Sequence, residues 1–338
     1  MTALAPPGKT YTVPEEAVAI SFYDISQPNS LKPNSNPNTI YYLKKDFPSS
    51  LPTQNKVING EAELIHFTDS CPVFVPFDFK ADSIVYTRTF DKGFTGRRGG
   101  NNWTTMTLPF APDKVFNTVD SVEVDWFRPG DTEEKNFWLR EFCAEEGFYA
   151  YFTDVEEFEP NTPYIITVPD NYKGEEYSLV GKPLEFTAVN ADVLSGKIFA
   201  DAPHFNFLGS LTETKAMGDF IFCLNEEDGG NSFVYQSEPV DVKPFRAYFT
   251  AATEPREGMQ MYVASYIFQP ETDVEEGKKT DGVIEIAAPV SPSMPTNTGV
   301  YTLSGVKVAS VDASSLNEVL STLPKGLYII NGKKVLVR

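Results

Sequence analysis

The sequence predicts an all-β protein, with an antiparallel β-sandwich as its main domain and a small β unit at its C-terminus. Three observations lead to this prediction. Short aromatic and β-branched runs recur along the chain, separated by Gly, Pro, Asn or Asp. A helical period is convincing only at residues 314–323. Strands and helices do not alternate, which argues against a parallel sheet with crossover helices.

The composition of the chain excludes several classes of protein and several classes of binding partner. The chain has 338 residues, with 28 basic and 47 acidic side chains and a net charge of −19. Aromatic residues make up 13%, which is enough for a packed core and excludes wholesale disorder. The acidic balance argues against nucleic acid and anionic membranes as partners, because binding phosphates requires clustered Lys and Arg. No apolar run approaches the roughly 20 residues that a membrane-spanning helix needs.

Residues 1–54 form an irregular, β-containing N-terminal segment. Pro and Asn are frequent, and residues 26–38 (SQPNSLKPNSNPN) have the composition of an irregular stretch. Two short apolar runs, 17–25 and 39–43, are candidates to pair as strands.

Residues 55–268 form the predicted sandwich module, of the jelly-roll or Ig-like kind. Alternation is clear at 83–90, where Ile84, Tyr86 and Arg88 share one face of the strand. The predicted strands lie near 63–67, 83–90, 103–110, 121–127, 137–142, 148–153, 164–168, 184–189, 205–210, 220–224, 232–236, 246–250 and 259–268.

A linker is predicted over residues 269–298. Its first half is charged, and its second half contains three prolines, which favour an extended, semi-rigid chain.

The C-terminal unit, residues 299–338, is predicted to contain two hairpins. Ser304-Gly305 turns the first, and Asn331-Gly332, a pair suited to a type I′ turn, turns the second. A short helix over 314–323 lies between them.

The end of the chain resembles the C-terminal sorting domain of proteins that Bacteroidetes export through the type IX (Por) secretion pathway. The family pattern VYxLxGxKV followed by LPKGxYIVNGKKVxVK matches here at Tyr301, Leu303, Gly305, Lys307, Leu323, Pro324, Gly326, Tyr328, Gly332, Lys333, Lys334 and Val335. The resemblance implies that the tail contacts secretion machinery. The tail is shorter than a complete sorting domain, and the alternative interpretation is a small structural β cap.

The main domain is similar to the repeated β module at the C-terminus of Bacteroides and Prevotella (Bacteroidales) cell-surface proteins, many of which are leucine-rich-repeat adhesins of the BspA-like type. The resemblance covers about residues 55–268 and depends on the ordered runs 86–90, 102–110, 161–169, 205–210 and 244–251. Leucine-rich repeats are absent from this sequence, so no adhesin residue is carried over.

The two ends of the sequence point to different locations. Residues 1–16 have neither the charged start nor the apolar centre of a signal peptide. The sorting-like tail implies an extracellular or outer-membrane-surface location. We therefore expect that this sequence is a piece of a longer, exported precursor.

The sequence contains two histidines, and they are its first candidates for a catalytic role. His66 lies within the predicted strand 63–67 and is interpreted as a half-buried structural residue. His204 lies at a loop-to-strand transition, where a surface role is favoured over catalysis. Cys71 is close to His66 in sequence, but a strand-borne His and a Cys before Pro72 have no recognised nucleophile context. The sequence also lacks G-x-S-x-G, P-loop and H-E-x-x-H motifs.

The three cysteines, Cys71, Cys143 and Cys223, form no C-x-x-C pair, so a zinc or redox motif is excluded. They are interpreted as small buried apolar residues, and a disulfide between two of them stays open.

Charged loops contain candidate residues for binding a metal ion or an anion. Two acidic groups are possible calcium ligands, although neither has EF-hand spacing and solvated hairpin tips are favoured. Arg97 and Arg98 lie between glycines, where they can grip an anion, mark a protease-sensitive tip or belong to an ordinary flexible hairpin end. The acidic groups are Asp154, Glu156, Glu157 and Glu159, and Glu226, Glu227 and Asp228.

These observations favour a non-catalytic, secreted or surface-displayed accessory or adhesive module, without cofactor or metal. A host or glycan ligand is expected, but no ligand-binding residue is assigned. The alternative is a carbohydrate-binding module associated with polysaccharide processing, and an enzyme such as a glycosidase ranks third. Trp103, Trp126 and Trp138 are candidates for stacking a sugar, although core packing is the favoured interpretation of all three.

Overall fold

The computed structural model describes residues 10–24, 28, 30–45, 51–96, 101–131, 134–171, 174–196, 198–201, 204–216, 220–238, 240–251, 253, 259–265, 297–302, 307–312, 326–330 and 333–337. The all-β prediction is confirmed. The 3-10 turn η1 (Glu175–Tyr177) is the only helical element among these residues. None of them forms a helix with the length and apolar character that crossing a membrane requires. The chain divides into two compact units, residues 1–267 and 268–338.

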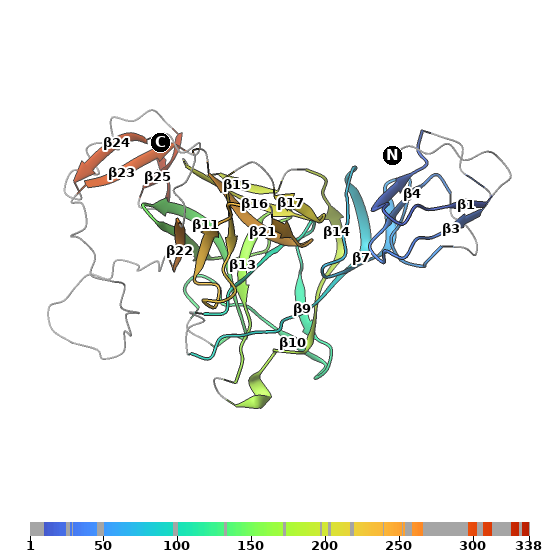
Figure 1. The fold of residues 1–338 in the computed structure, drawn as a ribbon, viewed down its shortest axis with the longest axis horizontal. Helices are drawn as coiled ribbons and strands as arrows, with labels where there is room; N and C mark the ends of the chain where they lie inside the picture. The colour runs from blue at the N-terminus through green and yellow to red at the C-terminus, as the bar shows by residue number, and fades with distance from the viewer. Residues whose placement is uncertain are drawn as a thin grey trace. The chain divides into compact units, whose positions relative to one another are not determined.

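One sheet of the first unit has eight strands within the described residues, in the order β10-β9-β14-β7-β6-β5-β4-β2. Strands β4, β7, β9, β10 and β14 of this sheet are labelled in Figure 1. Its strands are β2 (Ala19–Ser21), β4 (Ile40–Leu43), β5 (Lys56–Ile58), β6 (Glu61–Thr68), β7 (Phe79–Thr89), β9 (Lys114–Asn117), β10 (Val122–Val124) and β14 (Pro183–Val193).

A second sheet has ten strands in the described part of the chain, in the order β15-β16-β21-β18-β19-β22-β12-β11-β13-β8. Its strands are β8 (Thr104–Thr107), β11 (Trp138–Glu146), β12 (Tyr149–Asp154), β13 (Pro163–Thr167), β15 (Phe199–Asp201), β16 (Phe205–Ser210), β18 (Ile221–Leu224), β19 (Ser232–Tyr235), β21 (Arg246–Ala251) and β22 (Gln260–Ser265). Two small sheets pair β1 (Thr10–Thr12) with β3 (Ser30–Lys32) and β17 (Thr214–Ala216) with β20 (Val240–Val242). Each predicted strand of residues 55–268 thus overlaps an observed one.

The N-terminal segment winds as a coil. The runs predicted to pair do so in β2 and β4, with Ala19 opposite Ile40, but the pairing is parallel. Strands β1 and β3 form one parallel stack, and β2, β4 and β5 form the other. A small apolar core accompanies the two stacks and contains Val13, Phe22, Leu31, Tyr41 and Leu43.

The expectation of a purely antiparallel sheet is wrong. Besides the N-terminal stacks, β6 pairs with β7 and β12 pairs with β22 in parallel. Between β6 and β7 the chain crosses back over residues 69–78, and Val73 and Val75 in this crossover are buried in the main core. Apolar burial holds this connection, where an antiparallel pair would use a tight turn.

Asparagine side chains replace regular pairing at the corner of the coil. Asn38 is fully buried, and its Nδ2 donates to the carbonyl oxygens of Thr68 (2.9 Å) and Cys71 (2.6 Å). Its Oδ1 accepts from the Thr68 amide at 2.7 Å. Asn55 is equally buried and bonds both backbone groups of His66 in the same way. The Pro- and Asn-rich stretch therefore ends in ordered, buried structure.

The main core joins the two large sheets. Tyr86 and Phe186 from the eight-stranded sheet pack with Phe137 and Phe245, which lie beside strands of the ten-stranded sheet. The Tyr86 and Phe245 ring centroids are 4.8 Å apart. The predicted alternation in β7 is confirmed, because Ile84, Tyr86 and Arg88 are all buried.

The ten-stranded sheet curls on itself. Its distant strands β8 and β21 meet, since the Thr107 amide donates to the Phe245 carbonyl oxygen (3.3 Å) and the Ala247 amide donates to Thr105 Oγ1 (2.9 Å). A second core of phenylalanines lies against this sheet. It includes Phe142, Phe152, Phe207, Phe222, Phe233 and Phe249.

The second unit contains a four-stranded sheet in the order β24-β23-β25-β26 among its described residues. Its strands are β23 (Asn297–Thr302), β24 (Lys307–Asp312), β25 (Gly326–Ile330) and β26 (Lys333–Val337). The antiparallel pairing predicted for both hairpins is confirmed. The predicted helix 314–323, both turn dipeptides and nearly all of the linker lie outside the described residues.

The buried asparagine gives a stability prediction. Replacing Asn38 with Ala removes the partner of the Cys71 carbonyl oxygen and of the Thr68 amide, and leaves the Thr68 carbonyl oxygen with the Cys71 amide alone. We therefore expect a loss of about 2–4 kcal/mol in the free energy of unfolding. Urea denaturation measures this as a lower midpoint at unchanged slope. The control is Asn206→Ala on the half-exposed face of β16. Equal midpoints for the two variants would contradict the role assigned to Asn38.

Candidate functional site

The histidine–cysteine pair does not form an activated nucleophile. His66 Nε2 lies 3.1 Å from Thr87 Oγ1 on the neighbouring strand, and the His66 backbone is held by Asn55. Burial and the nearby Asp69 carboxylate raise the pKa of the Cys71 thiol, which disfavours a thiolate. These contacts give His66 the structural role that was expected.

All three cysteines are free. The option of a disulfide among them is therefore wrong. The interpretation as buried residues is also wrong, because Cys143 is exposed and Cys71 and Cys223 are only partly buried. Cys143 Sγ donates to the Tyr151 carbonyl oxygen at 3.3 Å. Desolvation of the thiol raises the pKa of Cys143 to about 12 and that of Cys223 to about 11, so both thiols are protonated at neutral pH.

The acidic groups are not gathered into a metal site. Within the described residues there is no group of three or more His, Cys, Asp or Glu side chains that could hold a metal ion. Asp154 accepts a hydrogen bond from Arg140 Nε at 2.7 Å, and Asp228 accepts from Ser232 Oγ and the Asn231 amide. Arg97 and Arg98 lie outside the described residues.

His204 lies on the surface, with its side chain 75% exposed. Its Nδ1 is 2.6 Å from Glu145 Oε1, and the same oxygen accepts from the His204 amide. This pair ties the loop before β16 to the end of β11.

The tryptophans do not form an exposed stacking surface. Trp103 and Trp126 are buried, and Trp138 is half-buried and stacks on Phe127 with centroids 4.0 Å apart. The Arg140 guanidinium lies 4.7 Å from the Trp138 ring centroid. Core packing, the favoured interpretation, thus accounts for all three.

A cluster of exposed and half-buried aromatic residues lies on and beside β12 and β22. Tyr149 and Tyr262 pair directly in the parallel register, and their ring centroids are 5.9 Å apart. Tyr151 follows two positions after Tyr149 on the same face of β12, at a centroid distance of 6.3 Å. Phe148 adjoins them, and its carbonyl oxygen accepts from the Tyr262 amide at 2.7 Å. We call Phe148, Tyr149, Tyr151 and Tyr262 the aromatic patch.

The core residues of the same strands force this patch outward. Ala150 and Phe152 alternate with the tyrosines of β12 and are fully buried, as is Met261 next to Tyr262. Phe148 is 58% exposed and Tyr262 47% exposed. These residues were not predicted from the sequence, in which only the tryptophans were candidates for stacking a sugar. The alternation of residues 148–153 was the available signal.

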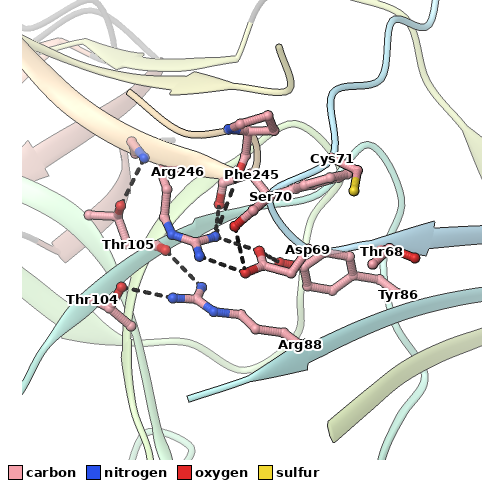
Figure 2. A network of polar contacts seen from close by, with 12 residues as sticks. Thr68, Asp69, Ser70, Cys71, Tyr86, Arg88, Thr104, Thr105, Phe245 and Arg246 are labelled. Atoms are coloured by element: carbon pink, nitrogen blue, oxygen red, sulfur yellow. Dashed lines mark hydrogen bonds and ion pairs between the residues drawn. The ribbon is translucent and has the colours of Figure 1, made fainter. Parts of the chain in front are cut away.

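A buried polar network joins the two large sheets (Figure 2). Arg246 at the start of β21 binds the Asp69 carboxylate with both terminal nitrogens, each at 2.7 Å. Tyr86 Oη donates to Asp69 Oδ1 at 2.5 Å. Arg88 donates to the Thr105 carbonyl oxygen and to Thr104 Oγ1, at 2.9 and 2.8 Å. We call Asp69, Tyr86, Arg88 and Arg246 the inter-sheet clamp.

The negative charge of Asp69 in the clamp is stabilised by the positive charges of Arg246 and Arg88. Burial alone would raise the pKa of Asp69, but the hydrogen bonds from Arg246 and the nearby Arg88 charge outweigh it and hold that pKa well below its usual range. Burial and the Arg246 charge lower the pKa of Arg88 to about 10, so it stays charged at neutral pH. The Arg246 and Asp69 side chains are less than one-fifth exposed, and we assign them a structural role.

The tail residues that resemble a sorting motif lie on the last two strands where they are described. Gly326 and Tyr328 lie on β25, with Tyr328 opposite Val335. Lys333 and Lys334 lie on β26, opposite Ile330 and Ile329. Leu323, Pro324 and Gly332 lie outside the described residues.

No protein-family model, curated protein or solved structure matches the chain. The kinship with Bacteroidales surface proteins therefore stays a prediction. What the molecule binds has to be inferred from the chemistry of its own surface.

The clamp predicts a pH-dependent stability. Because the pKa of folded Asp69 lies below its unfolded value of about 3.9, its contribution is complete above about pH 4 and is lost as the pH falls toward the folded pKa. Asp69→Asn should cost about 3 kcal/mol at pH 7, since it leaves buried guanidinium groups without a counter-charge. It should also reduce the loss of stability between pH 5 and pH 2.

Denaturant unfolding at several pH values measures both effects. The matched control is Asp82→Asn, an exposed position on β7. If Asp69→Asn and wild type lose stability in parallel from pH 5 to pH 2, the clamp does not depend on the Asp69 charge.

Proposed function

We propose that this protein is a non-catalytic module, secreted or displayed on a cell surface, that adheres to its ligand through the aromatic patch. The observation that carries the proposal is the cluster of Tyr149, Tyr151 and Tyr262 on one sheet face, with the exposed Phe148 in the turn beside them. Clustered, partly exposed aromatic residues are enriched at binding sites, because they bury much apolar area and lose little conformational entropy.

The support under the patch suits a binding role. Tyr149 and Tyr151 stand on β12, a strand held between β11 and β22 in the middle of the ten-stranded sheet. Phe142 and Phe152 pack beneath them with centroids 5.7 Å apart. A rigid base keeps the rings in place before a ligand arrives, which lowers the entropic cost of association.

A second candidate function, carbohydrate binding associated with polysaccharide processing, is favoured by the Tyr149–Tyr262 pair. A sugar ring has an apolar C–H face that stacks on an aromatic ring, and its hydroxyl groups bond polar atoms at the edge. Two tyrosine rings side by side on one face provide such a platform. The net charge of −19 favours neutral over polyanionic glycans.

The proposed location is the cell exterior or the outer-membrane surface. Its support is the resemblance of Leu323–Arg338 to a sorting tail, with secretion machinery as the proposed partner.

We propose a two-sheet sandwich, jelly-roll or Ig-like, as the finer class of the main domain. In support, the eight- and ten-stranded sheets share the main core.

Removing a ring from the aromatic patch tests the function. Tyr262→Ala should weaken binding to the ligand about tenfold or more, as expected for an aromatic anchor, while Tyr177→Ala, an exposed tyrosine on η1, should leave it unchanged. A glycan array and a host-cell adhesion assay provide the readouts. Loss on the array favours the carbohydrate-binding function, and loss in adhesion alone favours a protein ligand. Equal binding by Tyr262→Ala and wild type in both assays would refute the patch as the binding surface.

Deleting Leu323–Arg338 tests the location. The full-length protein should reach the cell surface or the medium, and the truncated form should stay within the envelope. Surface proteolysis and cell fractionation compare the two. Equal surface exposure of both forms would reduce the tail to a structural cap, and a full-length form confined to the cytoplasm would contradict the extracellular location.

A further inference from the structure

The aromatic patch has an acidic edge. Tyr262 lies directly opposite Ser232 of β19 in the antiparallel register. Ser232 Oγ donates to Asp228 Oδ2, and the Asn231 amide donates to Asp228 Oδ1 at 2.9 Å. Asp228 is exposed, and the two residues before it in the turn are exposed glutamates. These hydrogen bonds hold a negatively charged turn beside the Tyr262 end of the patch.

The strands under the patch carry no opposing charge. Among their described residues, β12, β19 and β22 contain no Lys or Arg. Lys92 contacts the acidic turn through the Glu226 carbonyl oxygen, which lies 3.1 Å from its Nζ. On the opposite side of the patch, the β11 position paired with Tyr149 is Glu146. The patch therefore lies in a negatively charged part of a chain whose net charge is −19, and this charge favours a cationic ligand.

The tyrosine rings of the patch are suited to a planar cation. The centroid of the Tyr149 ring is 5.9 Å from that of Tyr262 and 6.3 Å from that of Tyr151. Ala144 and Ala264 flank Tyr151 in the register, and such short side chains do not cover its ring. A guanidinium is attracted to the face of an aromatic ring, and its N–H groups also donate to carboxylates. Arginine therefore uses both kinds of group found here, the rings and the acidic edge.

The spacing of the rings matches an extended peptide. Alternate side chains of an extended chain lie on one face, about 6.5–7 Å apart. The Tyr149 and Tyr262 centroids are 5.9 Å apart, and the two residues lie on neighbouring strands. A peptide that crosses β12 and β22 can therefore place the side chains of its residues i and i+2 over these two rings.

We propose that the aromatic patch binds an extended protein segment with arginine at alternate positions. One guanidinium stacks on Tyr262 and donates to the Asp228 carboxylate, and the next stacks on Tyr149. This inference rests on the proposed function, because it names the ligand of the same patch. The ligand is then a protein with a cation at each anchor, and a neutral segment of the same shape binds more weakly.

Two matched peptides isolate the positive charge. The probes are the acetylated peptide amide Ser-Arg-Ser-Arg-Ser and the same peptide with citrulline in place of both arginines. Citrulline keeps the length of the side chain and replaces the guanidinium with a neutral urea group. Fluorescence anisotropy of the labelled peptides, titrated with the full chain at low ionic strength, measures each Kd. The arginine peptide should bind about tenfold more tightly, the size of two cation–π contacts.

A ring variant assigns this preference to the patch. Tyr262→Ala removes one of the two rings and should weaken binding of the arginine peptide about fivefold or more. Tyr177→Ala is the matched control, because Tyr177 is an exposed tyrosine that follows two glutamates in η1. It shares the ring and the neighbouring carboxylates but not the second ring, so this variant should leave the Kd unchanged.

A charge variant tests the acidic edge. Asp228→Asn keeps an acceptor oxygen in the turn and removes the charge, so the preference for arginine over citrulline should narrow about threefold. Asp82→Asn, at an exposed position on β7, makes the same change in net charge and should leave the preference unchanged. Thermal unfolding verifies that the variants are folded, and either Tyr262→Ala or Asp228→Asn provides the test if the other is not.

The outcomes separate this inference from the proposed function. Equal binding of the two peptides, lost in Tyr262→Ala, would overturn the inference and leave the patch a binding surface. A preference for arginine that persists in both Tyr262→Ala and Asp228→Asn would mean general attraction to an acidic protein, and would also overturn it. Binding of neither peptide would overturn the inference alone, since the glycan array and the adhesion assay decide the proposed function separately.

Discussion

The arrangement of the first unit depends on the buried ion pair between Asp69 and Arg246, which joins the crossover after β6 to the ten-stranded sheet. Asp69 begins the crossover after β6, and Arg246 begins β21, 177 positions later in the chain. Their two parallel hydrogen bonds fix where the crossover meets the ten-stranded sheet. Tyr86 completes the carboxylate's partners and packs its ring on Phe245, a residue with a positive φ of 62°. An arrangement of the sheets that left this buried charge without its partners would lower the free energy of unfolding by several kcal/mol, and the observed arrangement is therefore strongly favoured.

Because the ten-stranded sheet curls around a core, the aromatic residues on the outer face of β12 and β22 are left exposed to solvent. Its concave side is filled by phenylalanines such as Phe152 and Phe207, whose ring centroids are 5.6 Å apart. Because side chains alternate along a strand, filling the inside with Ala150 and Phe152 puts Tyr149 and Tyr151 outside. The core thus determines both which aromatic residues are available to a ligand and how firmly they are held.

The winding of the N-terminal coil has a different physical basis. Local turn signals predict antiparallel hairpins, because such a turn reverses the chain within a few residues. Parallel neighbours need a crossover, and here the crossover corners are held by buried amides such as Asn38 and Asn55. Asparagine suits this role because one side chain both donates to carbonyl groups and accepts from an amide, replacing the backbone pairing that a corner lacks. The same Asn and Pro content therefore indicated loops in the sequence and forms ordered corners in the structure.

The sequence by itself determined the strands, because alternation such as Ile84, Tyr86 and Arg88 is a local property that the pleat imposes on neighbouring residues. It also indicated that the tryptophans pack in the core and that the C-terminal unit is a pair of hairpins. Only the tertiary structure decided which strands pair in parallel and that Asp69 meets Arg246. Each of these depends on contacts between residues far apart in the chain, and a single sequence carries no signal for such distances. The aromatic patch lies between the two cases: alternation predicts that Tyr149 and Tyr151 share a face, but only the core shows that this face points to solvent.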